Sequence, residues 1–230
     1  MLMRYMQKFL VAACAPVLAF NLFAADSTSD PATIMTERGK LLLSDDFKGP
    51  ALGKEWRVGK GKWEFADGVL KGSELKSDMH GAVMRRALPF HDLIVQYSFK
   101  LDGAKMTTLS INDAKEHVCR ALMNSAGFTV QKDDHDHDGP DKAVRFETHA
   151  MPLKAGEWYT VVVEIRGKEM IARIGDKHIA YGGHEALDVD KANFGLTVAG
   201  ESASFKNFRV WEALPKKDWD KSQLAALRKN

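Results

Sequence analysis

A long series of short alternating segments constrains the fold of this chain more than any other feature. Between Leu41 and Ala213, apolar and polar residues alternate with the two-residue period of half-buried strands. Gly, Asp and Asn residues interrupt these runs at intervals of about 8 to 12 residues, a spacing typical of sandwiches and barrels. Only residues 217–229 have the composition of a helix. The sequence therefore predicts an all-β domain followed by a short C-terminal helix.

One tight turn can be located within this pattern. Asp67-Gly68 readily adopts the positive φ angles of a two-residue hairpin turn, so residues 63–65 and 69–72 are expected to pair. The longest β-rich runs are residues 92–101 and 158–165. The other predicted strands are residues 81–86, 106–112, 117–123, 128–132, 143–150, 170–174, 178–181, 194–198 and 203–211.

The first 25 residues predict a secretory signal peptide. Arg4 and Lys8 accompany an apolar stretch over residues 9–23 that is too short for a membrane span, so no transmembrane segment is expected in the mature chain. A lipoprotein anchor at Cys14 is the alternative. We therefore expect a secreted or periplasmic protein with a linker over residues 26–40, a domain over residues 41–213 and a tail over residues 214–230.

The charge of the chain bears on its partners, and its cysteine content bears on whether a disulfide can stabilise it. The chain has 33 basic and 31 acidic residues, and removal of Arg4 and Lys8 with the signal leaves equal numbers. A neutral, mixed surface gives no electrostatic reason to expect nucleic acid as a partner. Without Cys14, Cys119 is the single cysteine, so no intramolecular disulfide can form. Its strand-like surroundings predict a buried structural thiol.

Several motifs occur in a familiar order. Trp56 begins a Trp-x-x-x-x-Gly-x-Trp-x-x-x-Asp-Gly segment, and Gly156 begins Gly-x-Trp-Tyr-Thr-Val-Val-Val-Glu. Phe194 begins Phe-Gly-Leu-x-Val, which is followed by Phe-Lys-Asn-Phe-Arg-Val from Phe205. This order resembles the concanavalin A-like jelly-roll superfamily. More narrowly, it is similar to secreted 3-keto-disaccharide hydrolase domains, which are described as family 16 glycoside hydrolase-like.

The resemblance implies a fold and a class of partner. The fold would be a jelly-roll sandwich of two antiparallel sheets, and the partner would be a carbohydrate. Family 16 glucanases carry a Glu-x-Asp-x-x-Glu strand that supplies the carboxylate pair for retaining hydrolysis. No such triplet occurs here: the segment from Glu164 to Glu169 lacks the central acid and is broken by Gly167. Retaining glucanase chemistry is therefore not expected.

A group of polar residues in the middle strands is the main candidate site. Strand periodicity places Ser110 and Asn112 on one face, and it places Arg120 on the face opposite to His117. Such a face could hydrogen-bond sugar hydroxyls, or hold the oxyanion of a keto-sugar during proton abstraction. It could equally be a hydrated outer face of a sandwich. The proposed substrate-binding residues are Arg85, Ser110, Asn112, Arg120 and Lys132.

Three residues are candidates for acid–base chemistry. His117 and Asp113 lie in the same polar region, and His80 precedes Gly81 at the entrance of a predicted strand. A histidine at that position could act as a general base or a metal ligand, or it could be an ordinary loop histidine. The predicted catalytic residues are therefore His80, Asp113 and His117.

An acidic run next to these strands predicts a metal site. Asp134, Asp136 and Asp138 alternate and are followed by Gly139, as in the first half of a calcium loop. The twelfth position from Asp134 is Arg145, where such a loop has an acid. Alternatively, His135 and His137 could bind a transition metal, or the segment could be a solvated loop tip.

Two readings of function follow from these observations. The first is a glycan-active enzyme related to 3-keto-disaccharide hydrolases. The second is a non-catalytic carbohydrate-binding or adhesion module, which could bind calcium as its cofactor.

Overall fold

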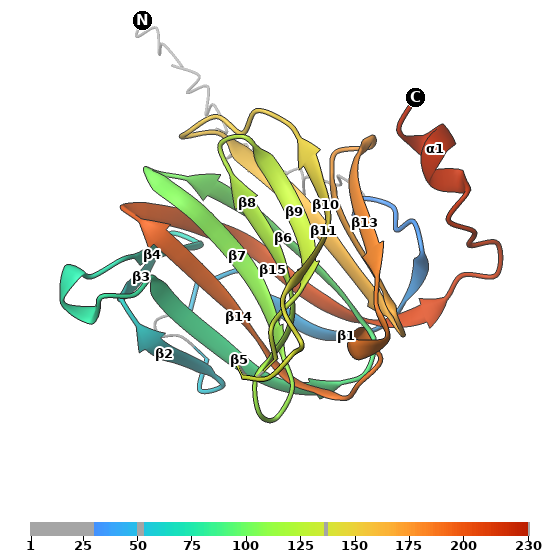
Figure 1. Ribbon diagram of the computed structural model, residues 1–230. Coiled ribbons are helices and arrows are strands. Elements are labelled where there is room, and N and C mark those ends of the chain that lie inside the picture. Colours follow the sequence, from blue (N-terminus) through green and yellow to red (C-terminus); the bar gives the residue numbers. More distant parts are fainter. Residues whose placement is uncertain (1–29, 50–52, 136–137, 230) are drawn as a thin grey trace, which may run out of the picture. The chain divides into compact units, whose positions relative to one another are not determined.

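Two antiparallel sheets pack against each other in the computed structural model, which describes residues 30–49, 53–135 and 138–229 (Figure 1). Sheet A has the strand order β13 (His178–Gly183), β12 (Glu169–Ile174), β11 (Trp158–Arg166), β6 (Leu93–Leu101), β15 (Ser202–Pro215), β4 (Val69–Ser73) and β3 (Lys62–Ala66). Strand β1 (Thr36–Asp45) also pairs with β15. Sheet B has the order β10 (Val144–Ala150), β9 (Gly127–Lys132), β8 (His117–Asn124), β7 (Ala104–Asn112), β14 (Lys191–Gly200), β5 (Ala82–Phe90) and β2 (Trp56–Lys60).

The core lies between the sheets and is rich in aromatic side chains. Phe208 stacks on Tyr97 with ring centroids 5.3 Å apart and on Phe194 at 5.4 Å. Trp56 meets Phe208 edge-on at 5.5 Å. Strand alternation directs these rings inward, and each buries a large apolar area that drives folding. The predicted all-β sandwich of two antiparallel sheets is confirmed, and α1 (Gln223–Leu227) is the predicted short C-terminal helix.

The predicted tight turn and the predicted buried thiol are both confirmed. Asp67 and Gly68 have φ angles of 53° and 75°, and they connect the antiparallel pair β3 and β4. Cys119 is fully buried in β8, as predicted, and burial raises the pKa of its thiol to about 12. The thiol is therefore protonated at neutral pH and serves as a packing group.

The ends of the domain differ from the sequence prediction. Strand β1 begins at Thr36, inside the predicted linker over residues 26–40, and β15 continues to Pro215, inside the predicted tail. The two segments pair with each other from Thr36 opposite Pro215. The polar sequence at the start of β1 hides this pairing, because that segment forms a strand only against β15. The predicted signal peptide over residues 1–25, including Cys14, lies outside the described residues.

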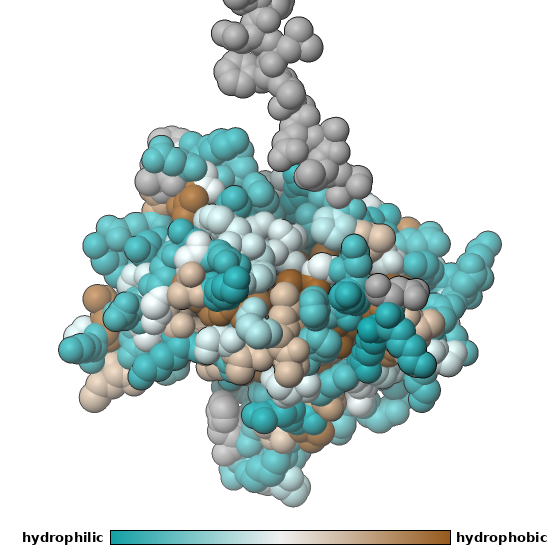
Figure 2. All heavy atoms as spheres, turned by 90° about the horizontal axis from the view of Figure 1, so that it is seen from above, coloured by the Kyte–Doolittle hydropathy of each residue, from teal (hydrophilic) through white to brown (hydrophobic). Residues whose placement is uncertain are grey.

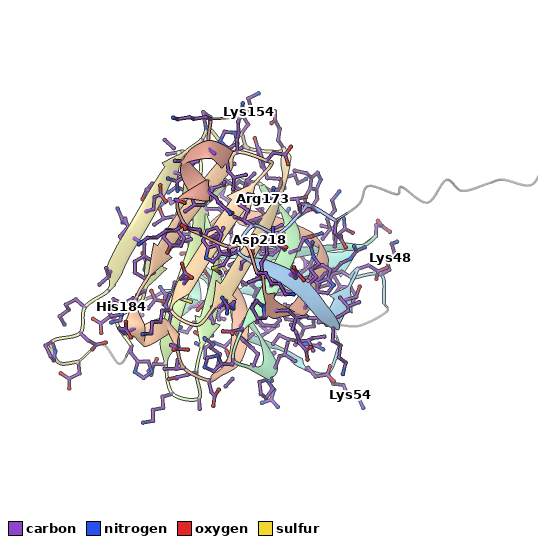
Figure 3. The ribbon with its side chains drawn as sticks, turned by 90° about the vertical axis from the view of Figure 1, so that its right-hand side faces the viewer. Lys48, Lys54, Lys154, Arg173, His184 and Asp218 are labelled. Atoms are coloured by element: carbon purple, nitrogen blue, oxygen red, sulfur yellow. The ribbon has the colours of Figure 1, made fainter. Side chains whose placement is uncertain are left out.

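The outer face of sheet A is covered by segments near the two ends of the domain. Ile34 and Met35 pack with Ile171, Ile179 and Leu224 in a second apolar cluster. Figure 3 views this side of the structure and labels Arg173, which donates a hydrogen bond to the Ala32 carbonyl. Segments from the two ends of the domain therefore shield the outer face of sheet A from solvent.

Surface composition elsewhere is mainly hydrophilic. Figure 2 shows one face from above, where apolar side chains form small patches among hydrophilic ones. Large exposed apolar residues such as Val58, in β2, and Met79, in the segment before β5, are separate in the sequence. Within the ranges that the structure describes, no helix is both long enough and apolar enough to cross a membrane.

Candidate functional site

A groove opens on the outer face of sheet B, across strands β5, β14, β7 and β8. Its volume is about 250 Å³. Ser110 and Thr108 form part of its lining with only 3 % and 2 % of their surfaces exposed, so they lie below longer side chains. The groove brings together five of the residues predicted from the sequence: His80, Arg85, Ser110, His117 and Arg120.

A β-bulge explains how His117 and Arg120 both reach the groove. Simple alternation predicted opposite faces for them, and that prediction was wrong. The register between β7 and β8 shifts, because Ile111 pairs with Cys119 while Asn112 pairs with His117. Val118 takes the extra position and is buried. A bulge places two residues opposite one and thereby re-aims the side chain before it.

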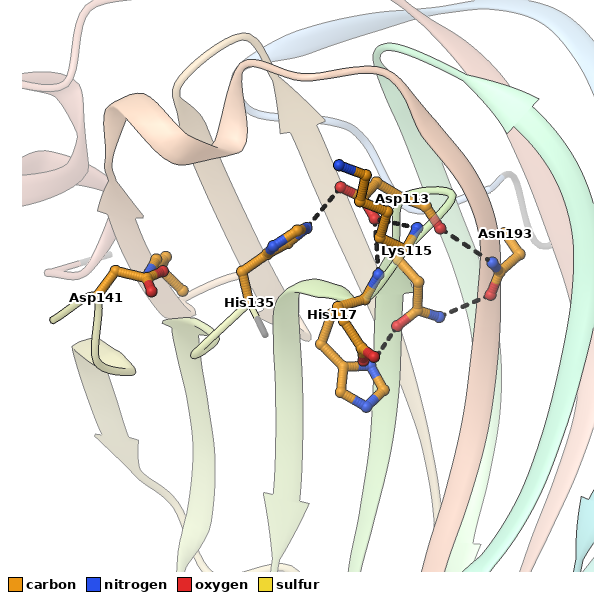
Figure 4. A network of polar contacts seen from close by, with 9 residues as sticks. Asp113, Lys115, His117, His135, Asp141 and Asn193 are labelled. Carbon is orange, nitrogen blue, oxygen red and sulfur yellow. Dashed lines mark hydrogen bonds and ion pairs between the residues drawn. The ribbon is translucent and has the colours of Figure 1, made fainter. Parts of the chain in front are cut away.

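A chain of side-chain hydrogen bonds holds His117 in place (Figure 4). Its Nδ1 lies 2.5 Å from Asn112 Oδ1, and Asn112 Nδ2 donates to Asn193 Oδ1 at 2.7 Å. Asn193 Nδ2 in turn donates to the backbone carbonyl of Asp113 at 3.5 Å. With the Asn112 oxygen as an acceptor, the neutral imidazole carries its proton on Nδ1, so Nε2 carries the lone pair. The network therefore prepares Nε2 to act as a base.

Arg120 is fixed at the other side of the groove by a buried acid. Arg120 Nε lies 2.8 Å from Asp133 Oδ2, and Gln131 Nε2 donates to Asp133 Oδ1 at 2.8 Å. Only 4 % of the Asp133 side chain is exposed, compared with 29 % for Arg120. Asp133 therefore orients the guanidinium from below, while the cation keeps access to the groove.

Asp113 and Lys132 belong to a neighbouring pocket of about 360 Å³. Lys132 is opposite Cys119, so its side chain leaves the sheet on the core side and binds Asp141 at 2.8 Å. Asp113 Oδ2 lies 2.6 Å from His135 Nε2. The structure thus places these two predicted site residues outside the groove. The alternation of the strand alone predicts the core side for Lys132, since residues two positions apart share a face and Val130 is buried.

Asp113 is held as a carboxylate within that pocket. Partial burial opposes ionisation, but the backbone N–H groups of Glu116 and Lys115 and the His135 ring outweigh it and lower the pKa of Asp113. An acid that is ionised and fully engaged in this way stabilises the β7–β8 turn. It is poorly suited to donating a proton to a substrate in the groove.

The predicted calcium site is only partly covered by the structure. Asp136 and His137 lie outside the described residues. Asp138 accepts the Gly139 N–H, Asp134 lies 3.7 Å from Lys142, and His135 is bound to Asp113. Among the residues with described positions, no group of three or more His, Cys, Asp or Glu side chains could hold a metal ion. Calcium at Asp134, Asp136 and Asp138 stays a prediction.

Two residues of the site were missed by sequence reasoning. Asn193 lies 81 positions after Asn112, and only the pairing of β14 with β7 brings them together. Asp133 carried a usable signal, because it directly follows Lys132 at the end of β9. An acid at a strand end, next to an arginine on the neighbouring strand, is a reasonable candidate for an ion pair.

The lining of the groove limits its chemistry. No carboxylate and no Phe, Tyr or Trp side chain line it within the described part of the chain. Hydrolysis by a pair of carboxylates, as in glucanases, needs two acids flanking the bond. The groove offers a histidine base, two arginines and several hydroxyl groups instead, a set suited to hydrogen bonding and to stabilising negative charge.

Comparisons with known proteins identify the fold. No family model matches the chain, and no curated protein sequence matches it. A Bacillus subtilis protein of unknown function with a galectin-like fold has a TM-score of 0.61 at 15 % identity, covering 79 % of this chain and 100 % of that one. Carbohydrate-binding module CBM66 from Bacillus subtilis has a TM-score of 0.57 at 15 % identity, covering 69 % and 96 %.

An enzyme has the same architecture. An endo-β-1,3-glucanase from Pyrococcus furiosus has a TM-score of 0.57 at 10 % identity, covering 77 % of this chain and 95 % of the other. At these identities the likeness shows the fold alone, because one fold serves many functions. The chain has the concanavalin A-like jelly-roll fold.

Proposed function

We propose that this protein is a secreted or periplasmic glycan-active domain that binds a carbohydrate in the groove on sheet B and cleaves 3-keto-glycosides. The observation that carries the proposal is the orientation of His117 by Asn112 and Asn193 beside a groove that contains Arg85 and Arg120. The sequence resemblance to 3-keto-disaccharide hydrolases and the jelly-roll neighbours that act on or bind carbohydrates support it.

A ketone at C3 of the sugar makes the neighbouring C2–H bond acidic, and this chemistry suits the groove. His117 Nε2 takes the C2 proton, and the C–H electron pair forms an enolate whose negative oxygen faces the arginines. When the ketone at C3 reforms, the electron pair of the enolate C2–C3 double bond moves to form a C1–C2 double bond. The bond from C1 to the glycosidic oxygen then breaks, and its electrons leave with that oxygen. The leaving oxygen takes the proton back from His117. Addition of water across the double bond completes a net hydrolysis.

The second candidate is a non-catalytic carbohydrate-binding module. The observation that favours it is the groove lining, which has hydrogen-bonding groups but no carboxylate within the described residues. A binding module needs only such donors and acceptors, together with a rigid sheet. The two candidates share a ligand and a face, and they differ in the role of His117.

A cleavage assay on the purified domain separates the candidates. We would incubate it with 3-keto and unmodified disaccharides, with and without a chelator, and measure released monosaccharide. We expect cleavage of the keto substrate, and a loss on the order of 10²–10⁴-fold in kcat for His117→Ala. His184→Ala is the matched control, because His184 is exposed outside the groove. Saccharide binding without cleavage would establish the binding module and reject the enzyme.

A further inference from the structure

A single row of residues crosses the whole outer face of sheet B. Successive strand pairings align Arg57 with Arg85, Arg85 with Gly195, and Gly195 with Ser110. The row continues through the pairs Ser110–Arg120, Arg120–Gln131 and Gln131–Arg145. Directly paired residues of antiparallel strands point to the same side of the sheet. Four arginines therefore lie in one line: Arg57 and Arg85 are direct neighbours, and uncharged residues separate Arg85 from Arg120 and Arg120 from Arg145.

The charge of this row is poorly neutralised by the protein. Arg57, Arg85 and Arg145 are exposed and form no hydrogen bond or ion pair with any residue that the structure describes. Only Arg120 has an acid partner there, Asp133. Like charges that face each other across a strand pair destabilise a sheet, and Arg57 and Arg85 are such a pair. An arrangement that costs stability in the free protein is expected to favour an anion.

Gly195 opens the middle of the row. A Cβ atom at this position would lie 3.2 Å from Arg85 Cγ and 2.9 Å from the Met84 carbonyl oxygen. The absence of a side chain lets the stem of Arg85 lie close to β14, beside Ser110 at the bottom of the groove. The groove thereby connects the arginines on its two sides without a barrier of side chains between them.

We propose that the groove binds an acidic glycan, with its chain lying across the strands along the arginine row. The proposal rests on the proposed carbohydrate function and adds the charge of the ligand. Neighbouring strands are about 4.8 Å apart, so the row from Arg57 to Arg145 spans roughly 29 Å. An arginine fork binds a carboxylate or a sulfate in a bidentate manner, so sugar carboxylates or sulfate esters are the groups recognised.

The same face argues against a nucleic acid as the polyanion. Binding of single strands uses aromatic side chains on which bases stack. The described lining of the groove has hydroxyl groups and cations but no Phe, Tyr or Trp side chain, the large rings on which bases stack best. Sugar hydroxyls next to anionic groups match this lining better than bases do.

Titration calorimetry tests the proposal with defined ligands. We would compare an oligogalacturonate disaccharide and hexasaccharide, sulfated oligosaccharides of the same lengths, their neutral counterparts and single-stranded DNA. The hexasaccharide is expected to bind more tightly than the disaccharide, and binding is expected to weaken as salt rises. Arg57→Gln and Arg145→Gln should each weaken hexasaccharide binding about tenfold. Arg166→Gln, on sheet A, is the matched control and should have no effect.

The outcomes distinguish this proposal from the proposed function. Equal affinity for neutral and acidic hexasaccharides, or unchanged binding by the Arg57 and Arg145 variants, would overturn the acidic ligand even if keto-disaccharides are cleaved. Tighter binding of DNA than of either acidic hexasaccharide would overturn it as well. Length-dependent binding of an acidic hexasaccharide without any cleavage would support it and reject the catalytic role of His117. The carboxylate and sulfate series identify which anionic group is recognised.

Discussion

The two outer faces of this sandwich satisfy their polar groups in opposite ways. On sheet A, Glu164 has no exposed surface and accepts the backbone N–H groups of Ile34, Met35 and Thr36 at 2.7–2.8 Å. On sheet B, Arg85 and Arg57 face solvent beside a groove. Polar residues on a sheet therefore do not by themselves mark a binding face. What matters is whether the chain already supplies their partners.

This difference assigns distinct roles to the two faces. The polar groups on sheet A tie the start of the domain to the sheet, so they contribute to stability. The polar groups on sheet B are held in place by neighbours, as His117 is by Asn112, and they surround a groove that a ligand can enter. Substitutions on sheet A should thus change stability, and those on sheet B should change binding or turnover.

The largest effect is expected on sheet A. Glu164→Gln removes the charge and one acceptor that hold three backbone N–H groups, and the unsatisfied donors stay buried. We expect a loss of about 3 kcal/mol in the free energy of unfolding, measured by urea denaturation. Glu212→Gln, an exposed position on β15 of the same sheet, should cost less than about 0.5 kcal/mol. Equal losses of unfolding free energy in both variants would show that the hydrogen bonds of Glu164 to the backbone of residues 34–36 do not stabilise this face.

A smaller effect is expected when the hydrogen bonds that position His117 on sheet B are weakened. Asn193→Ala removes the acceptor for Asn112 Nδ2 and loosens the position of the imidazole. We expect kcat on a 3-keto-disaccharide to fall about tenfold with little change in KM, because the groove itself is retained. Thr129→Ala, on the same face but outside the groove, is the control. A rise in KM with kcat unchanged would instead assign Asn193 to substrate binding.

The smallest effect concerns the seam where the sheets meet at β10 and β13. His149 Nε2 lies 2.9 Å from His178 Nδ1 across this seam. Burial, with the charges of His178 and Arg228, lowers the pKa of His149 below its usual 6.5. The unfolded chain then binds the proton more readily, so this contribution to stability is present above about pH 6.5 and is lost as the pH falls.

Thermal unfolding at several pH values checks this sign. His149→Gln cannot titrate, so its melting temperature should depend less on pH between about pH 7 and pH 5 than that of the wild type. Binding to the groove should be unaffected at neutral pH, because the seam lies outside it. An unchanged slope of melting temperature against pH in the variant would contradict the role assigned to His149.

The parts of the fold set by local sequence could be predicted, and those set by distant pairing could not. Asp67 and Gly68 fix a tight turn by their own backbone preferences, and alternation alone placed Ser110 and Asn112 on one face. The start of β1 at Thr36 is different, because its polar residues form a strand only against β15. The hydrogen bonds from the backbone of residues 34–36 to Glu164 likewise join residues about 130 positions apart.

The candidate site was predicted to a similar extent. The residue types were identified, since five of them line one groove. Their geometry was not, because the bulge at Val118 depends on how β8 pairs with β7. The same limit applies to Asn193, whose role exists only because β14 lies beside β7. Local patterns thus indicated the chemistry of the site, while sheet register determined which residues act together.

Chemical-shift mapping is the most direct test of the contrast between the two faces. A 3-keto-disaccharide would be titrated into the isotope-labelled domain while backbone amide signals are followed. We expect the shifted amides to cluster on β5, β14, β7 and β8, around the groove. We expect no shifts around Glu164 and Arg173 on sheet A. Shifts centred on sheet A, with the groove amides unchanged, would contradict it.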